Sequence, residues 1–164
     1  MRILDKKQIK QKINRIAIEI LENNYNQKEI ILAGINNNGY GFAQLLQKAI
    51  QKRTDIKSTL AQIKLNPAKP TAGEVTLSME ESEFKNKVVI IIDDVANTGR
   101  TIFYAFKPFL EILTKKVEVA VLVDRTHKSF PIKVDYVGMS LATTLKDNIV
   151  VELLSKSEME VYLQ

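Results

Sequence analysis

Two neighbouring carboxylates and a threonine–glycine turn follow the most apolar run of the sequence. Residues 88–92 are β-branched throughout, the strand they predict is expected to end at Asp93 and Asp94, and Thr98-Gly99-Arg100-Thr101 follows shortly after. Carboxylate oxygens can accept hydrogen bonds from the two vicinal hydroxyls of a ribose. The first-turn N–H groups of a helix have no internal partners, so residues 98–101 can surround a phosphate, with Gly99 allowing close approach. The segment therefore suits a sugar phosphate, and a carboxylate there would also stabilise positive charge developing on the anomeric carbon.

Two other common phosphate-binding motifs are absent from the sequence. There is no Gly-x-x-x-x-Gly-Lys-Ser/Thr and no Gly-x-Gly-x-x-Gly, so a P-loop nucleotidase or a Rossmann dehydrogenase would lack its binding device. A purely structural interpretation stays open, in which the two aspartates only end a strand and the threonine–glycine pair only begins a helix. Replacing Asp93 or Asp94 with asparagine distinguishes the interpretations, because only the functional one predicts a change in ligand binding.

The rest of the chain alternates between helix and strand patterns. Apolar residues at helical spacing predict helices over 9–21, 42–50 and 102–113, with Asp5 and Gln8 capping the first and a kink at Pro108 in the third. Apolar runs predict strands over 29–35, 56–65, 74–79, 88–92, 117–123, 134–137 and 149–154. A tight loop is expected at residues 36–39 and an irregular excursion at 66–73. The alternation predicts one α/β domain over residues 1–164, with a mainly parallel central sheet flanked by helices.

The composition limits the classes of protein to which the chain can belong. Its 164 residues, 45% of them apolar and 26% charged, can form one ordinary hydrophobic core. The chain has no cysteine, which suits a reducing, cytoplasmic compartment, and no apolar run approaches membrane-spanning length, so we expect no membrane association. The net charge of +5 permits an anionic partner, either a phosphorylated metabolite or RNA, although a lysine-rich solvated surface would give the same charge.

The segment from residue 88 to residue 101 resembles the phosphoribosyl-pyrophosphate signature of the type I phosphoribosyltransferases, which pairs an apolar strand with Asp-Asp and a Thr-Gly-x-Thr turn. Residues 121–128 and 131–138 are similar to one branch of that family, the bifunctional pyrimidine-operon attenuator and uracil phosphoribosyltransferase. Residues 14–17 and 34–39 resemble this branch too. The resemblance covers most of the chain apart from residues 57–87, and it implies the family's fold with a small hood region beside the central sheet.

The resemblance also implies a set of site residues. The phosphoribosyl pyrophosphate would be bound by Asp93, Asp94, Val95, Ala96, Asn97, Thr98, Gly99, Arg100 and Thr101, with Asp93 and Asp94 as the catalytic pair. The pyrophosphate loop would be Asn36, Asn37, Asn38 and Gly39, faced by Arg125. The nucleobase would lie against Val137, Gly138 and Met139, and Asp124 would hold Mg²⁺ through water. The implied reaction is displacement of pyrophosphate by a nucleobase, with uracil as the expected base and a homodimer as the expected assembly.

The sequence departs from the attenuator branch at several of these positions. Asn36, Asn37 and Asn38 are neutral where that branch has basic residues, and neutral groups make weaker contacts to a diphosphate. The excursion 66–73 is shorter than the family's lid and offers only Lys69 as a cation. Asn97 replaces an aromatic residue and Met139 replaces a lysine.

These departures keep a second hypothesis open, a weakly active or inactive phosphoribosyl-pyrophosphate-binding regulator that acts on RNA or on a protein partner. Arg15, Lys128 and Lys133 match basic positions of the branch's RNA-binding face. They are a small basis for RNA binding in a chain of this charge, so RNA is a possible partner that is not favoured. His127, the only histidine, follows the branch's Asp-Arg-x-His pattern, and a solvated loop histidine is the plainer interpretation of it.

Overall fold

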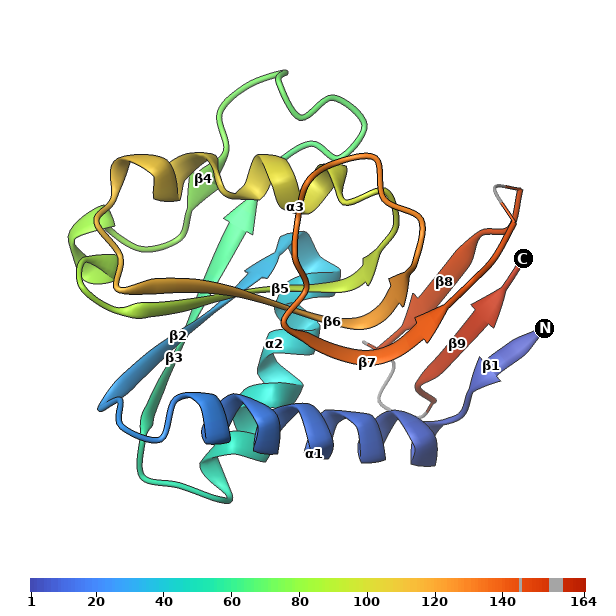
Figure 1. Cartoon of the computed structure of the whole chain (residues 1–164), viewed down its shortest axis with the longest axis horizontal. Helices are drawn as coiled ribbons and strands as arrows, with labels where there is room; N and C mark the ends of the chain where they lie inside the picture. Colours follow the sequence, from blue (N-terminus) through green and yellow to red (C-terminus); the bar gives the residue numbers. More distant parts are fainter. Residues whose placement is uncertain (145, 154–157) are drawn as a thin grey trace.

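The protein folds around two β-sheets, as a computed structural model shows for residues 1–144, 146–153 and 158–164 (Figure 1). The strands are β1 (Arg2–Leu4), β2 (Glu29–Ile35), β3 (Lys57–Lys64), β4 (Thr76–Leu77), β5 (Val88–Ala96), β6 (Lys116–Arg125), β7 (Tyr136–Leu141), β8 (Ile149–Glu152) and β9 (Glu160–Leu163). The helices are α1 (Lys6–Asn23), α2 (Asn36–Gln51) and α3 (Arg100–Ala105), with 3₁₀ turns η1 (Glu81–Phe84) and η2 (Lys107–Glu111). The larger sheet has the order β4-β3-β2-β5-β6-β7, and all its strands are parallel except β4. The predicted α/β fold with a mainly parallel sheet is confirmed.

Helices cover both faces of the larger sheet, with α1 and α2 on one side and α3 with η2 on the other (Figure 1). Alternate residues of β2 enter the two cores. Ile30 and Leu32 pack in the core that includes Ile16 of α1, whereas Ile31 packs in the core that includes Phe109 of η2. Burial on both faces explains why the central strands are apolar throughout. None of the helices in the described residues is both long and apolar enough to cross a lipid bilayer.

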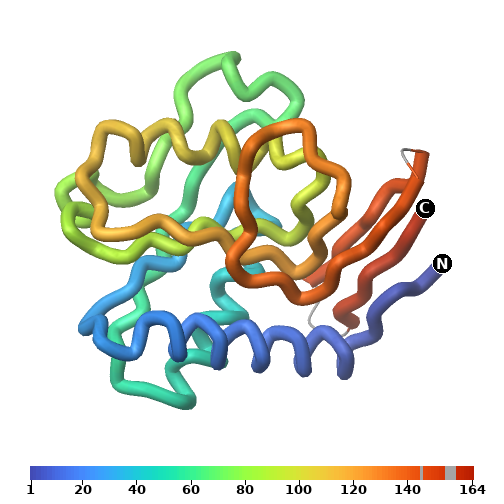
Figure 2. The backbone as a smooth tube through the Cα atoms, viewed as in Figure 1, coloured from blue at the N-terminus to red at the C-terminus, as the bar shows by residue number. Residues whose placement is uncertain are grey.

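The two ends of the chain meet in the smaller sheet. Strands β1, β9 and β8 are antiparallel in that order, and the backbone tube shows the first and last segments side by side (Figure 2). The N–H of Leu163 donates to the Met1 carbonyl at 2.8 Å. This sheet is the small hood region. The sequence did not predict β1 or β9, because strands of three and four residues are too short to show an alternating pattern.

Several predicted element boundaries are wrong. Residues 36–39 are not a tight loop but the first turn of α2, because Asn36 adopts a left-handed conformation (φ 50°) and turns the chain within a single residue. Strand β5 does not end at Asp93 but continues to Ala96, because β6 keeps pairing with it up to that residue. The helix predicted over 102–113 divides into α3 and η2, since Pro108 lacks the N–H that a continuous helix needs.

Strand positions were less accurate outside the central strands. The strand predicted over 134–137 begins and ends later, as β7, and the one predicted over 74–79 is only the two residues of β4. The strand predicted over 149–154 is β8, and residue 154 lies outside the described residues. The predicted cap of α1 is confirmed: the N–H of Gln8 donates to Asp5 Oδ1 at 2.8 Å, and Gln8 Oε1 accepts from the N–H of Asp5 at 2.9 Å.

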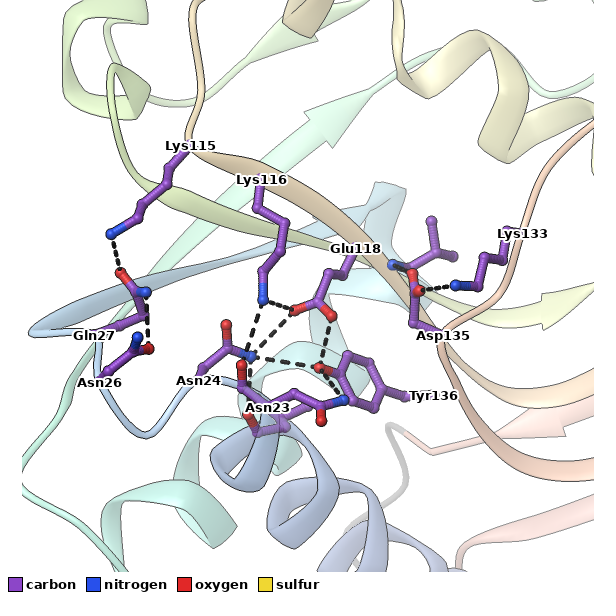
Figure 3. Close-up of polar contacts among 12 residues, drawn as sticks. Asn23, Asn24, Asn26, Gln27, Lys115, Lys116, Glu118, Lys133, Asp135 and Tyr136 are labelled. Atoms are coloured by element: carbon purple, nitrogen blue, oxygen red, sulfur yellow. Dashed lines mark hydrogen bonds and ion pairs between the residues drawn. The ribbon is translucent and has the colours of Figure 1, made fainter.

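A buried polar network joins the end of α1 to the first residues of β6 and β7 (Figure 3). The Tyr136 hydroxyl donates to Glu118 Oε2 at 2.8 Å, and the Asn24 amide donates to Glu118 Oε1 at 3.1 Å and to the Ile20 carbonyl at 2.8 Å. The Lys116 ammonium lies 3.3 Å from Glu118 Oε1. Burial raises the pKa of Tyr136 far above its ordinary value, so the hydroxyl keeps the proton that it donates. The network fixes α1 against the sheet at the amino-terminal ends of the strands.

Candidate functional site

A cleft of about 390 Å³ opens at the carboxyl ends of β2 and β5. It is lined by Ile35, Asn36, Asn37, Asn38, Pro67, Asp93, Asp94, Val95, Asn97, Thr101 and Ile149. The parallel pairing of β2 with β5 brings the start of α2 beside the aspartate pair, although these segments are far apart in the sequence. Ligands of open parallel sheets bind at such strand ends. The structure therefore places three groups around one cavity: the aspartate pair (Asp93 and Asp94), the asparagine-rich turn (residues 36–38) and Thr101.

The two aspartates stand in a low-dielectric environment at the floor of this cleft. Asp93 is 9% exposed, and its Oδ1 accepts a hydrogen bond from the N–H of Asp94 at 2.9 Å. Burial and then the neighbouring charge of Asp94 raise the pKa of Asp93 well above its ordinary value. Burial also raises the pKa of Asp94, against hydrogen bonds from Asp93 and from the N–H of Val95, which donates at 2.8 Å. Hydroxyl donors of a ligand would stabilise the ionised pair, which forms no ion pair with any side chain in the described part of the chain.

Asparagine at position 93 is expected to change how stability depends on pH. Folded Asp93 keeps its proton at pH values where the unfolded chain, with a carboxyl pKa of about 3.9, has lost it. Its contribution to the free energy of unfolding is therefore fully present below the unfolded pKa and is lost as the pH rises toward the folded pKa. In Asp93→Asn the free energy of unfolding should fall less than in the wild type as the pH rises above about 4. Urea unfolding at several pH values measures this difference, and equal slopes would contradict it.

The turn before α3 encloses a small hollow of about 50 Å³, lined by residues 95–102. Gly99 has a φ of 85°, and a Cβ there would lie 2.7 Å from the Ile132 side chain, so both the backbone and the space require glycine. The carbonyl of Thr98 accepts from the N–H groups of Ser129 and Phe130 at 3.0 and 3.1 Å. The segment between β6 and β7 thus holds the turn in place, and the hollow suits a group of a few atoms.

The asparagine-rich turn is the start of the 16-residue helix α2, and this end of the helix faces the cleft. The N-cap residue Ile35 makes no side-chain cap hydrogen bond, so the first N–H groups of α2 can donate to an anion. Gly39, in contrast, is buried, and a Cβ there would lie 2.5 Å from the Ile92 carbonyl oxygen. The structure places Gly39 in the contact between α2 and β5, whereas Asn36, Asn37 and Asn38 line the cleft.

Three charged residues near the cleft already have partners within the chain. Arg125 donates to Asn97 Oδ1 at 3.4 Å and to the Thr144 carbonyl at 2.6 Å. The Lys128 ammonium lies 2.5 Å from Asp124 Oδ1 and also donates to the Arg125 carbonyl. Asp124, predicted to hold Mg²⁺ through water, is thus paired with a cation of the protein itself.

A magnesium ion fits the aspartate pair only together with a ligand. Within residues 1–144, 146–153 and 158–164, no three histidine, aspartate or glutamate side chains gather closely enough to hold a metal. Magnesium is usually bound by one or two carboxylates together with phosphate oxygens of a substrate. Asp93 and Asp94, which both line the cleft, offer such a partial set of ligands.

The predicted nucleobase residues lie on β7 and are not part of the lining of this cleft. Val137, Gly138 and Met139 are all described, and none of them lines it. The Arg15 guanidinium donates to the carbonyls of Val137 and Gly138 at 3.1 and 2.6 Å, and Met139 lines a separate cavity of about 520 Å³ together with Arg15. Arg15, one of the predicted RNA-binding residues, therefore holds the backbone of the predicted nucleobase segment.

The other predicted RNA-binding residues also have partners within the chain. Lys128 is paired with Asp124, as described above, and the largely exposed Lys133 lies 3.5 Å from Asp135 Oδ1. His127 is exposed on the same segment between β6 and β7.

Two cleft residues lie outside the segments of family resemblance and were missed by the sequence analysis. Pro67 belongs to the irregular excursion and Ile149 to the hood. Neither is part of a sequence motif that predicts a binding site. The Arg100 guanidinium donates to the Pro67 carbonyl at 2.8 Å, so α3 holds the excursion beside the cleft. Such contacts depend on how distant segments pack.

Comparison with known proteins gives concordant results. A family model described as "Phosphoribosyl transferase domain" matches residues 1–156, which include the stretch 57–87 that the sequence resemblance left out. The Bifunctional protein PyrR of Macrococcus caseolyticus is 34% identical over 157 residues, covering 92% of this chain and 90% of the relative. The Clostridium novyi protein of the same name is 35% identical over 152 residues, covering 88% and 85%.

The fold is shared with solved structures of lower sequence identity. A hypoxanthine-guanine phosphoribosyltransferase from Bacillus anthracis superposes with a TM-score of 0.78 at 19% identity, over 99% of this chain and 96% of that one. The hypoxanthine phosphoribosyltransferase of Trypanosoma cruzi gives a TM-score of 0.80 at 15% identity, over 98% and 94%.

Proposed function

From the premise that the chain belongs to the phosphoribosyl transferase domain family, we propose that it transfers the 5-phosphoribosyl group of phosphoribosyl pyrophosphate to a nucleobase, with release of pyrophosphate. Uracil is the base that we propose. The resemblance to the attenuator branch and the similarity to proteins named PyrR support it. The cytoplasm is the proposed location and a homodimer the proposed assembly.

The observation that carries the proposal is the composition of the cleft. A phosphoribosyl pyrophosphate has a 5-phosphate, two vicinal hydroxyls and a diphosphate. The cleft offers Thr101 of the phosphate turn (residues 98–101), the Asp93 and Asp94 carboxylates, and the start of α2, whose N-cap residue has no side-chain cap. These three groups line one cavity, so a single donor molecule can contact all of them.

The proposed chemistry depends on positioning and electrostatics. The bond between the anomeric carbon and the diphosphate oxygen breaks as the nucleobase nitrogen forms its bond to the same carbon, and the proton that this nitrogen loses leaves with the pyrophosphate. Positive charge develops on the sugar meanwhile, and the carboxylates of Asp93 and Asp94, held in a low-dielectric cleft, would stabilise it. Bound Mg²⁺ would supply charge neutralisation for the departing diphosphate. The N–H groups at the start of α2 would orient the diphosphate away from the attacking base.

Pyrophosphate release from phosphoribosyl pyrophosphate in the presence of Mg²⁺ tests the proposal. Uracil, hypoxanthine and guanine are supplied in turn, because the structural relatives with the shared fold are named for purine bases. We expect release that depends on uracil. Release with a purine instead would correct the base but keep the reaction, whereas no release with any base would contradict the proposed transfer.

A second candidate function is a regulator that binds phosphoribosyl pyrophosphate with little turnover. The neutral side chains of Asn36, Asn37 and Asn38 favour it, because they offer no charge-assisted contacts to a diphosphate. Salt-dependent RNA binding that responds to phosphoribosyl pyrophosphate, in a protein without turnover, would support this function over the first.

A further inference from the structure

Among residues 1–144, 146–153 and 158–164, no Lys or Arg side chain lines the cleft where the diphosphate would lie. The lining residues at the start of α2 are asparagines. Arg100 is bound to the Pro67 carbonyl, Arg125 to Asn97 and Thr144, and Lys128 to Asp124. A donor with a diphosphate carries several negative charges, so some further basic side chain should lie within reach of the asparagine-rich turn.

Strand β3 places Lys64 beside that turn. Ile63 pairs with Ile35 in the parallel ladder, so the next residues of the two strands, Lys64 and Asn36, are neighbours across it. The N–H of Leu65 donates to Asn36 Oδ1 at 3.1 Å, which fixes the end of β3 to the turn. The backbone of Lys64 is thus held next to the start of α2.

The side chain of Lys64 lies on the face of β3 that is turned toward α2. Residues two apart in a strand project from the same face, so Lys64 shares the face of Gln62. The Gln62 amide donates to the Asn36 carbonyl at 3.0 Å and to Asn37 Oδ1 at 3.4 Å. Lys64 stands one step closer than Gln62 to the carboxyl end of the strand, which is the end where the cleft opens.

A second cavity, lined in part by Lys64, shares two lining residues with the cleft. This cavity, of about 450 Å³, is lined by Lys64, Asn36, Asn37 and Glu74 among others, and Asn36 and Asn37 also line the 390 Å³ cleft. Glu74 forms no ion pair with Lys64, and among the described residues no carboxylate lies within 4.0 Å of the Lys64 ammonium. The ammonium is therefore available to an anion bound at the turn.

We propose that Lys64 supplies the positive charge that binds the diphosphate of the donor. The third strand would thereby provide the charge that the asparagine-rich turn lacks. This inference rests on the proposed function, because it assumes a donor whose sugar lies against Asp93 and Asp94.

Calorimetry with two ligands tests this role. Pyrophosphate with Mg²⁺ occupies only the diphosphate position, whereas ribose 5-phosphate contacts the aspartates and the phosphate turn but carries no diphosphate. In Lys64→Gln we expect the Kd of pyrophosphate to rise about tenfold or more, and the Kd of ribose 5-phosphate to stay unchanged. Lys57→Gln is the matched control, because Lys57 lies at the opposite end of the same strand and its replacement should change neither Kd.

A double variant makes the test stricter. Asn37→Lys combined with Lys64→Gln returns a cation to the turn and should recover most of the pyrophosphate affinity. An unchanged pyrophosphate Kd in Lys64→Gln would overturn the inference, and so would an equal weakening of both ligands, which indicates a general disturbance. If the wild type binds pyrophosphate but not ribose 5-phosphate or phosphoribosyl pyrophosphate, the proposed function itself fails, and the role of Lys64 in it fails too.

Discussion

Asp94→Asn is expected to lower kcat/KM for pyrophosphate release by about 10²- to 10³-fold, the size of effect seen when one preorganised charge-stabilising group is removed from an active site. Asparagine keeps an oxygen that can accept the 2.8 Å hydrogen bond from the N–H of Val95, so the strand should keep its conformation. What is lost is the negative charge beside the sugar. The loss should therefore appear mainly in kcat, with a smaller change in the Kd of the donor.

Steady-state kinetics with the base that supports release, together with calorimetry of the donor, measure the two quantities separately. Asp55→Asn is the matched control, because Asp55 is exposed in the connection between α2 and β3 and its replacement removes the same charge far from the cleft. An Asp94→Asn protein with the wild-type kcat would exclude the proposed role of this carboxylate.

Gly39→Ala is expected to lower the free energy of unfolding by about 3 kcal/mol, at the upper end of the usual cost of overpacking. The added methyl group would lie 2.5 Å from the Ile92 carbonyl oxygen, which belongs to the backbone of a central strand and cannot move without disturbing the ladder. For a chain of this size the melting temperature should fall by about 6–12 °C.

Thermal unfolding of Gly39→Ala beside Gly73→Ala measures this effect. Gly73 also resists substitution, because its φ is 92°, but a Cβ there would meet no atom within 4 Å. Its replacement should cost only the backbone strain, about 1 kcal/mol. Equal losses in the two variants would show that the contact between α2 and β5 is not as close as described.

The sequence predicted the central strands well because burial on both faces leaves a continuous apolar run. Element boundaries predicted from the sequence are wrong where tertiary packing, and not the local composition, determines the conformation. The residues Asn36 to Gly39 have a loop-like composition, yet Asn36 alone makes the turn and the helix begins at once. Asp93 and Asp94 look like a strand end, yet pairing with β6 keeps them inside β5. The hood strands β1 and β9 pair across almost the whole length of the chain, so no local pattern could reveal them.

The candidate site was predictable to the extent that its residues belong to motifs. The aspartate pair and the asparagine-rich turn were both selected from the sequence, and the structure places them in one cleft. The partners of the basic side chains were not predictable, because a motif does not state that Arg15 will bind the carbonyls of β7 or that Lys128 will pair with Asp124. Pro67 and Ile149 reached the cleft through the packing of the excursion and the hood, which only the folded chain defines.

The network of Glu118, Tyr136 and Asn24 lies at the amino-terminal ends of the strands, whereas the cleft lies at their carboxyl ends. Along β6, the six residue steps from Glu118 to Asp124 span about 20 Å of strand. Substitutions separated by such a distance, without shared partners, have additive effects. Substitutions in the cleft can therefore change which ligand binds without altering the polar network at the other end of the sheet.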